Sequence, residues 1–292
     1  RILLESGVAV SALDDEAYTG LHMASAAGHT GAYVILGAVE AGADINAATE
    51  RGHRPLHLAA QYGHTPVVEL LLESNAEVDA RDERRYTPTH LACTYGHTET
   101  TRLLLLHGAD VDALDEENWS PFHWAAHLGN IYTARLLLLS GASRDAWTAN
   151  GHCALHLSAE NGHAEVVRML LEEGADLGVT DKAEYTPLHW ACQHGHVEVA
   201  RLLLGAGAGV DARPELLDTP LHLACLMGHP EVVGLLLSHG ADATAGDEDG
   251  KLPEEVVGMA EGSSLTHPDQ NNMVVALRQA RLGQQRRRVG ES

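Results

Sequence analysis

The sequence predicts an all-α repeat protein, a solenoid of stacked helix–turn–helix units. A short phrase, typified by Thr186-Pro187-Leu188-His189, recurs along the chain with spacings of 35, 33, 33, 33, 33 and 33 residues between its histidines. The same period carries a Gly-His pair and a Gly-Ala-Asp motif. Self-similarity at a fixed period is the signature of repeat architectures, in which neighbouring units cover apolar faces that one unit cannot bury alone. The phrase ends at His22, His57, His90, His123, His156, His189 and His222.

The first helix of each unit is expected to begin at this phrase. A Thr or Ser accepts orphan amide hydrogen bonds as the N-cap, and Pro at the first helical position has no N–H to leave unpaired. A glycine that follows the helix, such as Gly63 or Gly96, supplies a left-handed stop. The small pair Ala59-Ala60 after the histidine lets successive first helices approach closely.

The second helix follows at once, as in residues 165–171, and is expected to end at the Gly-Ala-Asp motif. Asn75 replaces that glycine once, and asparagine is the next-best residue at positive φ. Residues such as 109–115 hold too few apolar groups for a third helix and predict an extended turn. The first full unit carries two extra residues within 28–44, so we expect its second helix to be bulged or lengthened.

These motifs resemble the ankyrin repeat over roughly residues 14–255. The resemblance implies a curved ankyrin-type solenoid with β-hairpin fingers at right angles to the helices, and binding of other proteins as its usual activity. It divides the chain into a partial N-terminal repeat (1–13), seven repeats (14–246), a C-terminal capping repeat (247–283) and a basic flexible tail (284–292). Residues 1–10 look like the back half of a repeat, so we expect the chain to be a piece of something longer.

Composition and charge count against several classes of function. With 19 Lys and Arg against 41 Asp and Glu, the net charge of −22 repels polyphosphate and anionic lipid, so we expect no nucleic-acid or membrane partner. No stretch approaches the roughly 18 consecutive apolar residues of a membrane-spanning helix. Four cysteines without a C-x-x-C motif predict a reducing compartment rather than a disulfide scaffold. We therefore expect a cytoplasmic monomer, with the nucleus as an alternative location.

The charge is unevenly distributed along the chain. Residues 278–292 hold five arginines and one acid, a net charge of +4, whereas residues 1–277 hold 14 bases and 40 acids, a net charge of −26. The run Arg286-Arg287-Arg288 falls short of the five-to-eight-residue basic clusters that typify localisation signals. We interpret it as a solvated end or the start of a continuing chain.

Twenty histidines invite a metal or acid–base interpretation. Seven occupy the repeated phrase and six the Gly-His pair, so the repeat explains thirteen of them. The resemblance implies that the phrase histidines fix their own turn and bridge to the next repeat. His123 and His127 have the i, i+4 spacing of zinc proteases, but the glutamate that would activate water is absent. We expect no metal, no cofactor, no catalytic residue and no enzyme activity.

Two other features of the chain invite a chemical interpretation. Cys192 and Cys225 lie one repeat apart, but packed helices lie about 8–10 Å apart and a disulfide needs Cα atoms within about 7 Å, so they should not bridge. The glycine-rich run 205–209 suggests a phosphate cradle, yet a dinucleotide fingerprint opens a helix and this run closes one.

The positions that the repeat leaves free predict the functional surface. They lie nine, seven, six and four residues before each repeat histidine and four and five after it. In the ankyrin family these positions line the concave face. Seven of the twelve Phe, Trp and Tyr residues occupy them, and exposed Tyr and Trp give a large contact area at low entropic cost. The predicted protein-binding residues are Tyr18, His53, Tyr62, Tyr86, Tyr95, Trp119, His127, Trp147, His152, Tyr185 and His194, with Leu226 and Met227 near the end.

We predict a non-catalytic scaffold that binds a protein or extended peptide through this face. Acids such as Glu83, Glu116 and Glu248 outnumber bases such as Arg84 between the rings, which favours a basic and partly apolar partner. Other interpretations stay open. One alternative is that the rings gather where the helical core cannot hold them, or that they stiffen the array. Another is that the acidic excess serves to keep the array soluble. An alternative function is the recognition arm of a larger signalling, ubiquitin-ligase or channel polypeptide.

Overall fold

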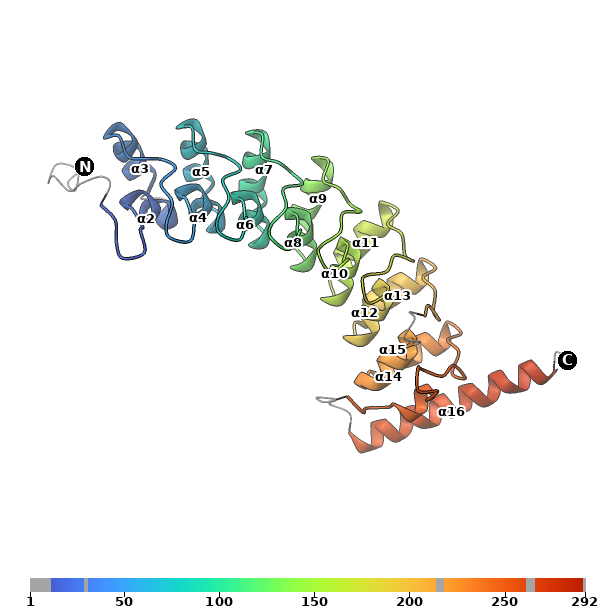
Figure 1. Cartoon of the computed structure of the whole chain (residues 1–292). Helices are drawn as coiled ribbons and strands as arrows, with labels where there is room; N and C mark the ends of the chain where they lie inside the picture. The colour runs from blue at the N-terminus through green and yellow to red at the C-terminus, as the bar shows by residue number, and fades with distance from the viewer. Residues whose placement is uncertain (1–11, 29–30, 214–217, 261–265, 291–292) are drawn as a thin grey trace. The chain divides into compact units, whose positions relative to one another are not determined.

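The structure, a computed structural model, describes residues 12–28, 31–213, 218–260 and 266–290. The chain divides into two compact units, residues 1–149 and 150–292. In the described residues fourteen helices pair into helix–turn–helix layers, and a longer helix follows them (Figure 1). We call the first helix of each layer the inner helix and the second the outer helix.

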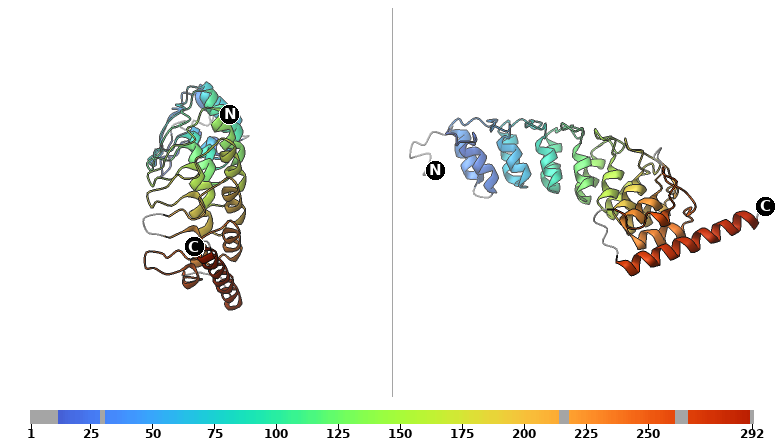
Figure 2. Two further views of the ribbon diagram at one scale, coloured as in Figure 1. Left: turned by 90° about the vertical axis from the view of Figure 1, so that its right-hand side faces the viewer. Right: turned by 60° about the horizontal axis from the view of Figure 1, so that its bottom comes forward.

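The first unit contains four layers. Each inner helix contacts the inner helix of the next layer, and each outer helix contacts the next outer helix, so the helices form two rows. The connecting loops line up along one side of these rows (Figure 2). The four layers are α2 (Gly20–Ala27) with α3 (Gly31–Glu40), α4 (Pro55–Gln61) with α5 (Thr65–Glu73), α6 (Pro88–Thr94) with α7 (Thr98–Leu106), and α8 (Pro121–His127) with α9 (Ile131–Leu139).

The second unit repeats this plan three times and then changes it. A short 3-10 helix, η2 (Pro253–Glu255), contacts α14 in place of a further full inner helix. The long helix α16 (His267–Gly290) packs against η2 and α15. The layers are α10 (Ala154–Glu160) with α11 (Ala164–Glu172), α12 (Pro187–Gln193) with α13 (Val197–Gly205), and α14 (Pro220–Met227) with α15 (Pro230–Ser238).

Helix boundaries follow the residues that predict them. The hydroxyl groups of Thr19, Thr87, Ser120 and Thr219 cap the inner helices by accepting a backbone N–H from the repeat histidine. Left-handed glycines follow the inner helices as expected, for example Gly63 at φ 69°. Asn75 adopts φ 66° after α5, which confirms its role as a glycine substitute. Helix α3 has ten residues against nine in α5, in line with the expected lengthening.

The fingers that connect the layers are tight turns rather than pairs of strands. In one finger the amide of Asp82 donates to the carbonyl of Tyr86 at 3.1 Å. Successive fingers are also linked, since the amide of Glu83 donates to the carbonyl of Arg51 at 3.0 Å. Within the described residues the one isolated β-bridge joins Leu13 to Thr19. The β-hairpin fingers implied by the resemblance therefore appear without regular strands.

The core of each unit lies between the two rows of helices. Leu56, Leu71 and Leu104 of the first unit are at most 1% exposed, and burial of each such side chain contributes about 1.5–3 kcal/mol. Ala59 and Ala60 are completely buried, as expected for small residues where inner helices approach closely. All four cysteines are buried and free, so the prediction that Cys192 and Cys225 do not bridge is confirmed.

The C-terminal residues differ from the prediction. Instead of a flexible tail from Gln284, helix α16 continues to Gly290. The Gln284 amide donates to the carbonyl of Ala241 at 2.7 Å, and Arg288 pairs with Asp242 at 2.9 Å. Residues 284–290 of the expected tail form the last turns of α16, whose side chains find polar partners in a loop more than forty residues earlier. The expected half repeat at residues 1–13 lies, apart from Ala12 and Leu13, outside the described residues.

Candidate functional site

Both ring nitrogens of each repeat histidine form hydrogen bonds with the backbone. Nδ1 of His57 accepts the backbone N–H of Arg54 at 3.1 Å, and its Nε2 donates to the carbonyl of Tyr86 in the next finger at 3.0 Å. A donor on one side and an acceptor on the other fix a neutral imidazole with the proton on Nε2. Burial accordingly lowers the pKa of His57 to about 4. The same pair of bonds is made by His22, His90, His123, His156, His189 and His222.

Within each unit, Gly-His histidines join a layer to the one before it. Nε2 of His64 and of His97 donates at 3.0 Å to a carbonyl in the inner helix of the preceding layer. In the second unit His196 and His229 make the corresponding bond at 2.8 and 3.0 Å. Asn130 takes this position once and donates to the carbonyl of Cys93 at 2.8 Å. His29, also predicted in this class, lies outside the described residues.

The His123 and His127 pair is explained without a metal. Both ring nitrogens of His123 are engaged, Nδ1 with the amide of Ser120 at 3.0 Å and Nε2 with the carbonyl of Ala146 at 3.0 Å. A metal ligand needs a free lone pair on the ring, which His123 lacks in this arrangement. His127 instead packs edge-on against Trp119, with ring centroids 5.2 Å apart.

An aromatic cluster in the first unit joins two finger rings to inner helix α8. Trp119 lies 4.6 Å from Trp124, and Tyr86 meets Trp124 edge-on at 5.7 Å. All three rings are half-buried. The indole N–H of Trp124 donates to Oδ2 of Asp115 at 3.1 Å, which fixes the ring between the finger and the helix. Tyr86, Trp119 and His127, three of the predicted protein-binding residues, therefore form one cluster centred on Trp124.

A second aromatic cluster, in the second unit, has the same construction. Trp190 meets Tyr185 edge-on at 5.8 Å and stacks on His194 at 5.9 Å. Its indole N–H donates to Oδ2 of Asp181 at 2.8 Å. His152 also donates to this carboxylate oxygen, at 3.2 Å.

Sequence reasoning missed Trp124 and Trp190, although a signal for them was present. Each follows a repeat histidine directly, where Leu58, Leu91 and Leu223 stand in other repeats. This position is not among those that the repeat leaves free, so it was not included in the predicted surface. Both tryptophans are half-buried, with their indole N–H groups bonded to finger carboxylates.

Three predicted Tyr and Trp rings are exposed to solvent. Tyr62 and Tyr95 follow α4 and α6 and are 52% and 55% exposed, and Trp147 is 45% exposed. Each tyrosine stacks on the Gly-His histidine that follows it, Tyr62 on His64 at 6.1 Å and Tyr95 on His97 at 6.4 Å. The face of each ring that is turned away from its histidine is the part available to a partner.

The other predicted residues are held by the scaffold. Tyr18 packs edge-on against His22 at 5.6 Å. His53 pairs with Oδ2 of Asp82 at 3.3 Å. Burial opposes the charged form of Asp82, but hydrogen bonds from His53 and from the amide of Tyr86 outweigh it and hold the pKa of the carboxyl below its usual value. Leu226 and Met227 are half-buried.

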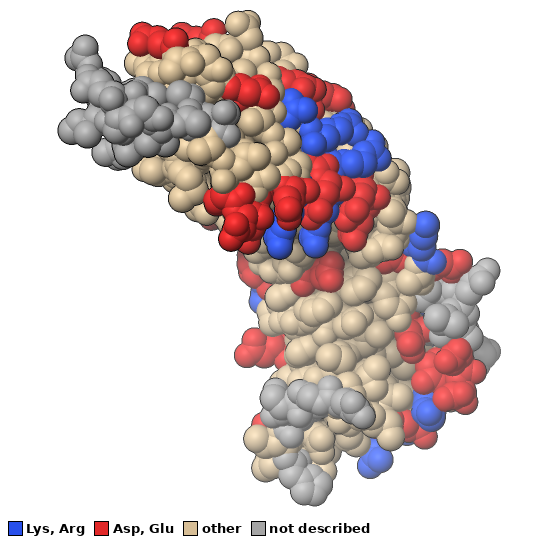
Figure 3. Space-filling model, turned by 60° about the vertical axis from the view of Figure 1, so that its left-hand side comes forward, with Lys and Arg blue, Asp and Glu red and all other residues tan. Residues whose placement is uncertain are grey.

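Charged groups of both signs lie on the fingers. The exposed finger residues of the first unit include Glu83 and Glu116 but also Arg51 and Arg84. In the face shown in Figure 3, acidic side chains gather in several groups and basic side chains lie directly beside some of them. The acidic excess of the chain is therefore locally interrupted by bases.

A family model for ankyrin repeats in three copies matches the chain at residues 1–82, 56–146, 89–181, 136–218 and 155–247. The chain belongs to the ankyrin repeat family. Among the solved structures that match, the crystal structure of the human ASB11 ankyrin repeat domain superposes with a TM-score of 0.69 at 27% identity, covering 77% of this chain and 98% of that one. A comparison with curated proteins found no match.

Membership of the ankyrin family defines a broad class of function. Ankyrin repeats are generally protein–protein interaction modules, and the fold is typically non-catalytic. Within the described residues, no helix combines the length and the apolar character needed to cross a bilayer.

Proposed function

We propose that this ankyrin array is a non-catalytic scaffold that binds a basic, partly apolar protein segment on its inner-helix and finger face. The observation that carries the proposal is the exposure of Tyr62 and Tyr95, 52% and 55%, at the same position of consecutive layers. Large rings that contribute little to the core are the residue type that dominates interface hot spots. The Tyr and Trp rings of the two aromatic clusters support the surface but are themselves half-buried.

The chemistry of this face favours cationic side chains in the partner. A Lys or Arg placed over an exposed tyrosine ring gains about 0.5–1 kcal/mol from the ring quadrupole. The net charge of −22 adds a long-range attraction for a basic segment. Apolar groups of the partner would cover the ring edges between these contacts.

A displayed library of random linear peptides, selected against the full chain, tests the proposal. We expect enrichment of peptides that combine Lys or Arg with aliphatic or aromatic residues. The double variant Tyr62→Ala/Tyr95→Ala should weaken the best peptide by about 30-fold, equivalent to about 2 kcal/mol. Fluorescence anisotropy measures the affinity.

Tyr132→Ala is the control, since Tyr132 is a still more exposed tyrosine (79%) that lies on an outer helix. It should leave the selected peptide's affinity unchanged. Recovery of acidic peptides only, or equal binding by the double variant with unchanged circular dichroism, would refute the proposed site.

A further inference from the structure

Four outer helices carry an arginine at one position of the repeat. Arg102, Arg135, Arg168 and Arg201 follow each other at intervals of 33 residues in α7, α9, α11 and α13. Three of these helices place a glutamate three residues earlier, and Arg102 pairs with Glu99 at 3.4 Å and Arg201 with Glu198 at 3.5 Å. In α7 and α13 this arginine is therefore paired with an acid on a solvent-exposed helix face.

Helix α9 departs from this pattern. Tyr132 stands where the glutamate belongs and is 79% exposed. Among the described residues no acidic side chain pairs with Arg135, which is itself exposed. Replacement of one acid by an aromatic ring has therefore left an exposed cation beside an exposed apolar group.

The last turns of α7 and α9 depart from the pattern as well. Their outermost residues are Leu106 and Leu139, which are 76% and 83% exposed. The corresponding positions of α5 and α11 hold Glu73 and Glu172. The repeat thus accepts a glutamate at this position, so neither leucine is required by the fold.

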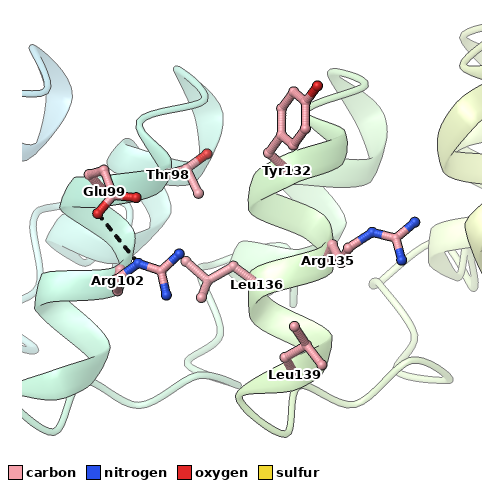
Figure 4. A pocket seen from close by; sticks show the side chains of 7 residues that line it. All are labelled: Thr98, Glu99, Arg102, Tyr132, Arg135, Leu136 and Leu139. Atoms are coloured by element: carbon pink, nitrogen blue, oxygen red, sulfur yellow. Dashed lines mark ion pairs between the residues drawn. The ribbon is translucent and has the colours of Figure 1, made fainter.

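These residues border two adjoining hollows between α7 and α9, which together we call the α7–α9 groove. One hollow of about 420 Å³ is lined by Arg102, Tyr132, Leu136 and Leu139 among others, and a neighbouring hollow of about 270 Å³ shares Arg102 and Leu136 and extends to Leu106. Figure 4 shows Arg102 reaching from α7 toward Leu136, with Tyr132 and Leu139 at opposite ends of α9. Tyr132, Leu136 and Leu139 follow at i, i+4 and i+7 and form one stripe along the helix.

We propose that this α7–α9 groove is a second docking surface, which binds an acidic amphipathic helix of another protein. The apolar face of that helix would cover Leu106, Leu136 and Leu139, as in helix-in-groove recognition. Its carboxylates would pair with Arg135, and with Arg102 in place of Glu99. The partner's charge is opposite to the one proposed for the inner face, so the two surfaces select different partners.

The positive charge of Arg102 and Arg135 also argues against two other occupants of the α7–α9 groove. A second copy of the chain, docked symmetrically through this groove, would bring Arg102 and Arg135 of both copies together. The helix α16 of a neighbouring molecule carries Arg278 and the run 286–288 on exposed positions, and these repel the same groove.

Binding of a designed peptide to the full chain tests the proposal. The probe is a fluorescein-labelled amphipathic helix with Leu at i, i+4 and i+7 and Glu on both flanks, compared with the same peptide carrying Lys for Glu. In the Tyr62→Ala/Tyr95→Ala variant, which removes the proposed inner-face site, we expect the acidic peptide to bind, with an affinity that falls as salt rises, and the basic peptide not to bind. Leu139→Glu and Arg135→Glu should each weaken binding at least tenfold.

The controls separate this surface from the inner face. Leu139→Glu introduces the residue that α11 already holds as Glu172, so the variant should fold, and an unchanged melting temperature verifies it. Tyr62→Ala/Tyr95→Ala should bind the acidic peptide normally. The proposal fails if Leu139→Glu binds the acidic peptide as tightly as the parent, if the basic peptide binds Tyr62→Ala/Tyr95→Ala as well as the acidic peptide does, or if sedimentation shows a dimer that Leu139→Glu abolishes.

Discussion

At the scale of single residues, the finger aspartates organise the candidate site. Oδ1 of Asp181 accepts the backbone amides of Ala183 and Tyr185 at 2.8 and 3.0 Å, while Oδ2 accepts His152 and Trp190. One buried carboxylate thus shapes the turn and orients two rings. This explains why a tryptophan replaces leucine after His189, because its indole N–H has a partner there.

Asp181→Ala should therefore destabilise the chain much more than Asp247→Ala. Asp247 makes the same two turn bonds, to the amides of Asp249 and Lys251, but no ring donates to it among the described residues. Each buried donor left without a partner costs about 1–3 kcal/mol, so we expect a loss of about 3 kcal/mol against about 1 kcal/mol. Urea denaturation followed by circular dichroism measures both variants. Equal losses would show that the ring contacts add nothing.

At the scale of the elements, layers are joined where an imidazole lies on a glycine. A Cβ at Gly195 would lie 2.6 Å from Nδ1 of His229, and the residue has φ +73°. His229 in turn donates to the carbonyl of Gln193 at 3.0 Å, next to that glycine. The glycine that ends an inner helix therefore also admits the side chain that ties the next layer to it.

Gly195→Ala is expected to cost more than Gly207→Ala. Gly207 also has positive φ (+97°), but a Cβ there would meet nothing within 4 Å. Both variants carry the left-handed strain of about 1–2 kcal/mol, and Gly195→Ala adds overpacking of about 1–3 kcal/mol. Urea midpoints measure the difference. Adding His229→Ala should make the cost of Gly195→Ala fall to that of Gly207→Ala, and a persistent difference would assign the cost to the backbone instead.

Local patterns predicted these elements well, and the misses have physical causes. The left-handed Asn75 and the free Cys192 depend on backbone geometry and on helix spacing, which the repeat fixes. Trp124 was missed because its position is a core position by period, and its half-buried state depends on a carboxylate nine residues earlier. Gln284 bonds to Ala243, 41 residues away, and periodicity contains no information about such a contact.

At the scale of the whole molecule, the buried histidines set the response to acid. Burial lowers the pKa of His57, His156 and His189 from 6.5 to about 4. It also lowers the pKa values of His22, His90, His123 and His222. Both units contain such histidines, so acid acts on the whole array and not on one layer. The opposing effect is the net charge of −22, whose self-repulsion weakens as protons bind.

The chain should lose stability as the pH falls from 6.5 toward 4. In this window the histidines bind protons in the unfolded chain but stay neutral in the folded chain. The free energy of unfolding is therefore highest above pH 6.5 and falls as the pH decreases to 4. At about pH 5 each of the three strongly shifted histidines costs roughly 2 kcal/mol, a large sum against a typical total of about 5–15 kcal/mol. Exposed carboxylates protonate mainly below about pH 4.5, and their repulsion is screened by salt. Above that pH the decrease in repulsion is therefore too small to offset the stability lost through the histidines. Urea midpoints measured between about pH 7.5 and pH 5 in 0.15 M salt should therefore fall steadily. A midpoint that rises over this range would mean that charge repulsion, and not the buried histidines, controls the acid response.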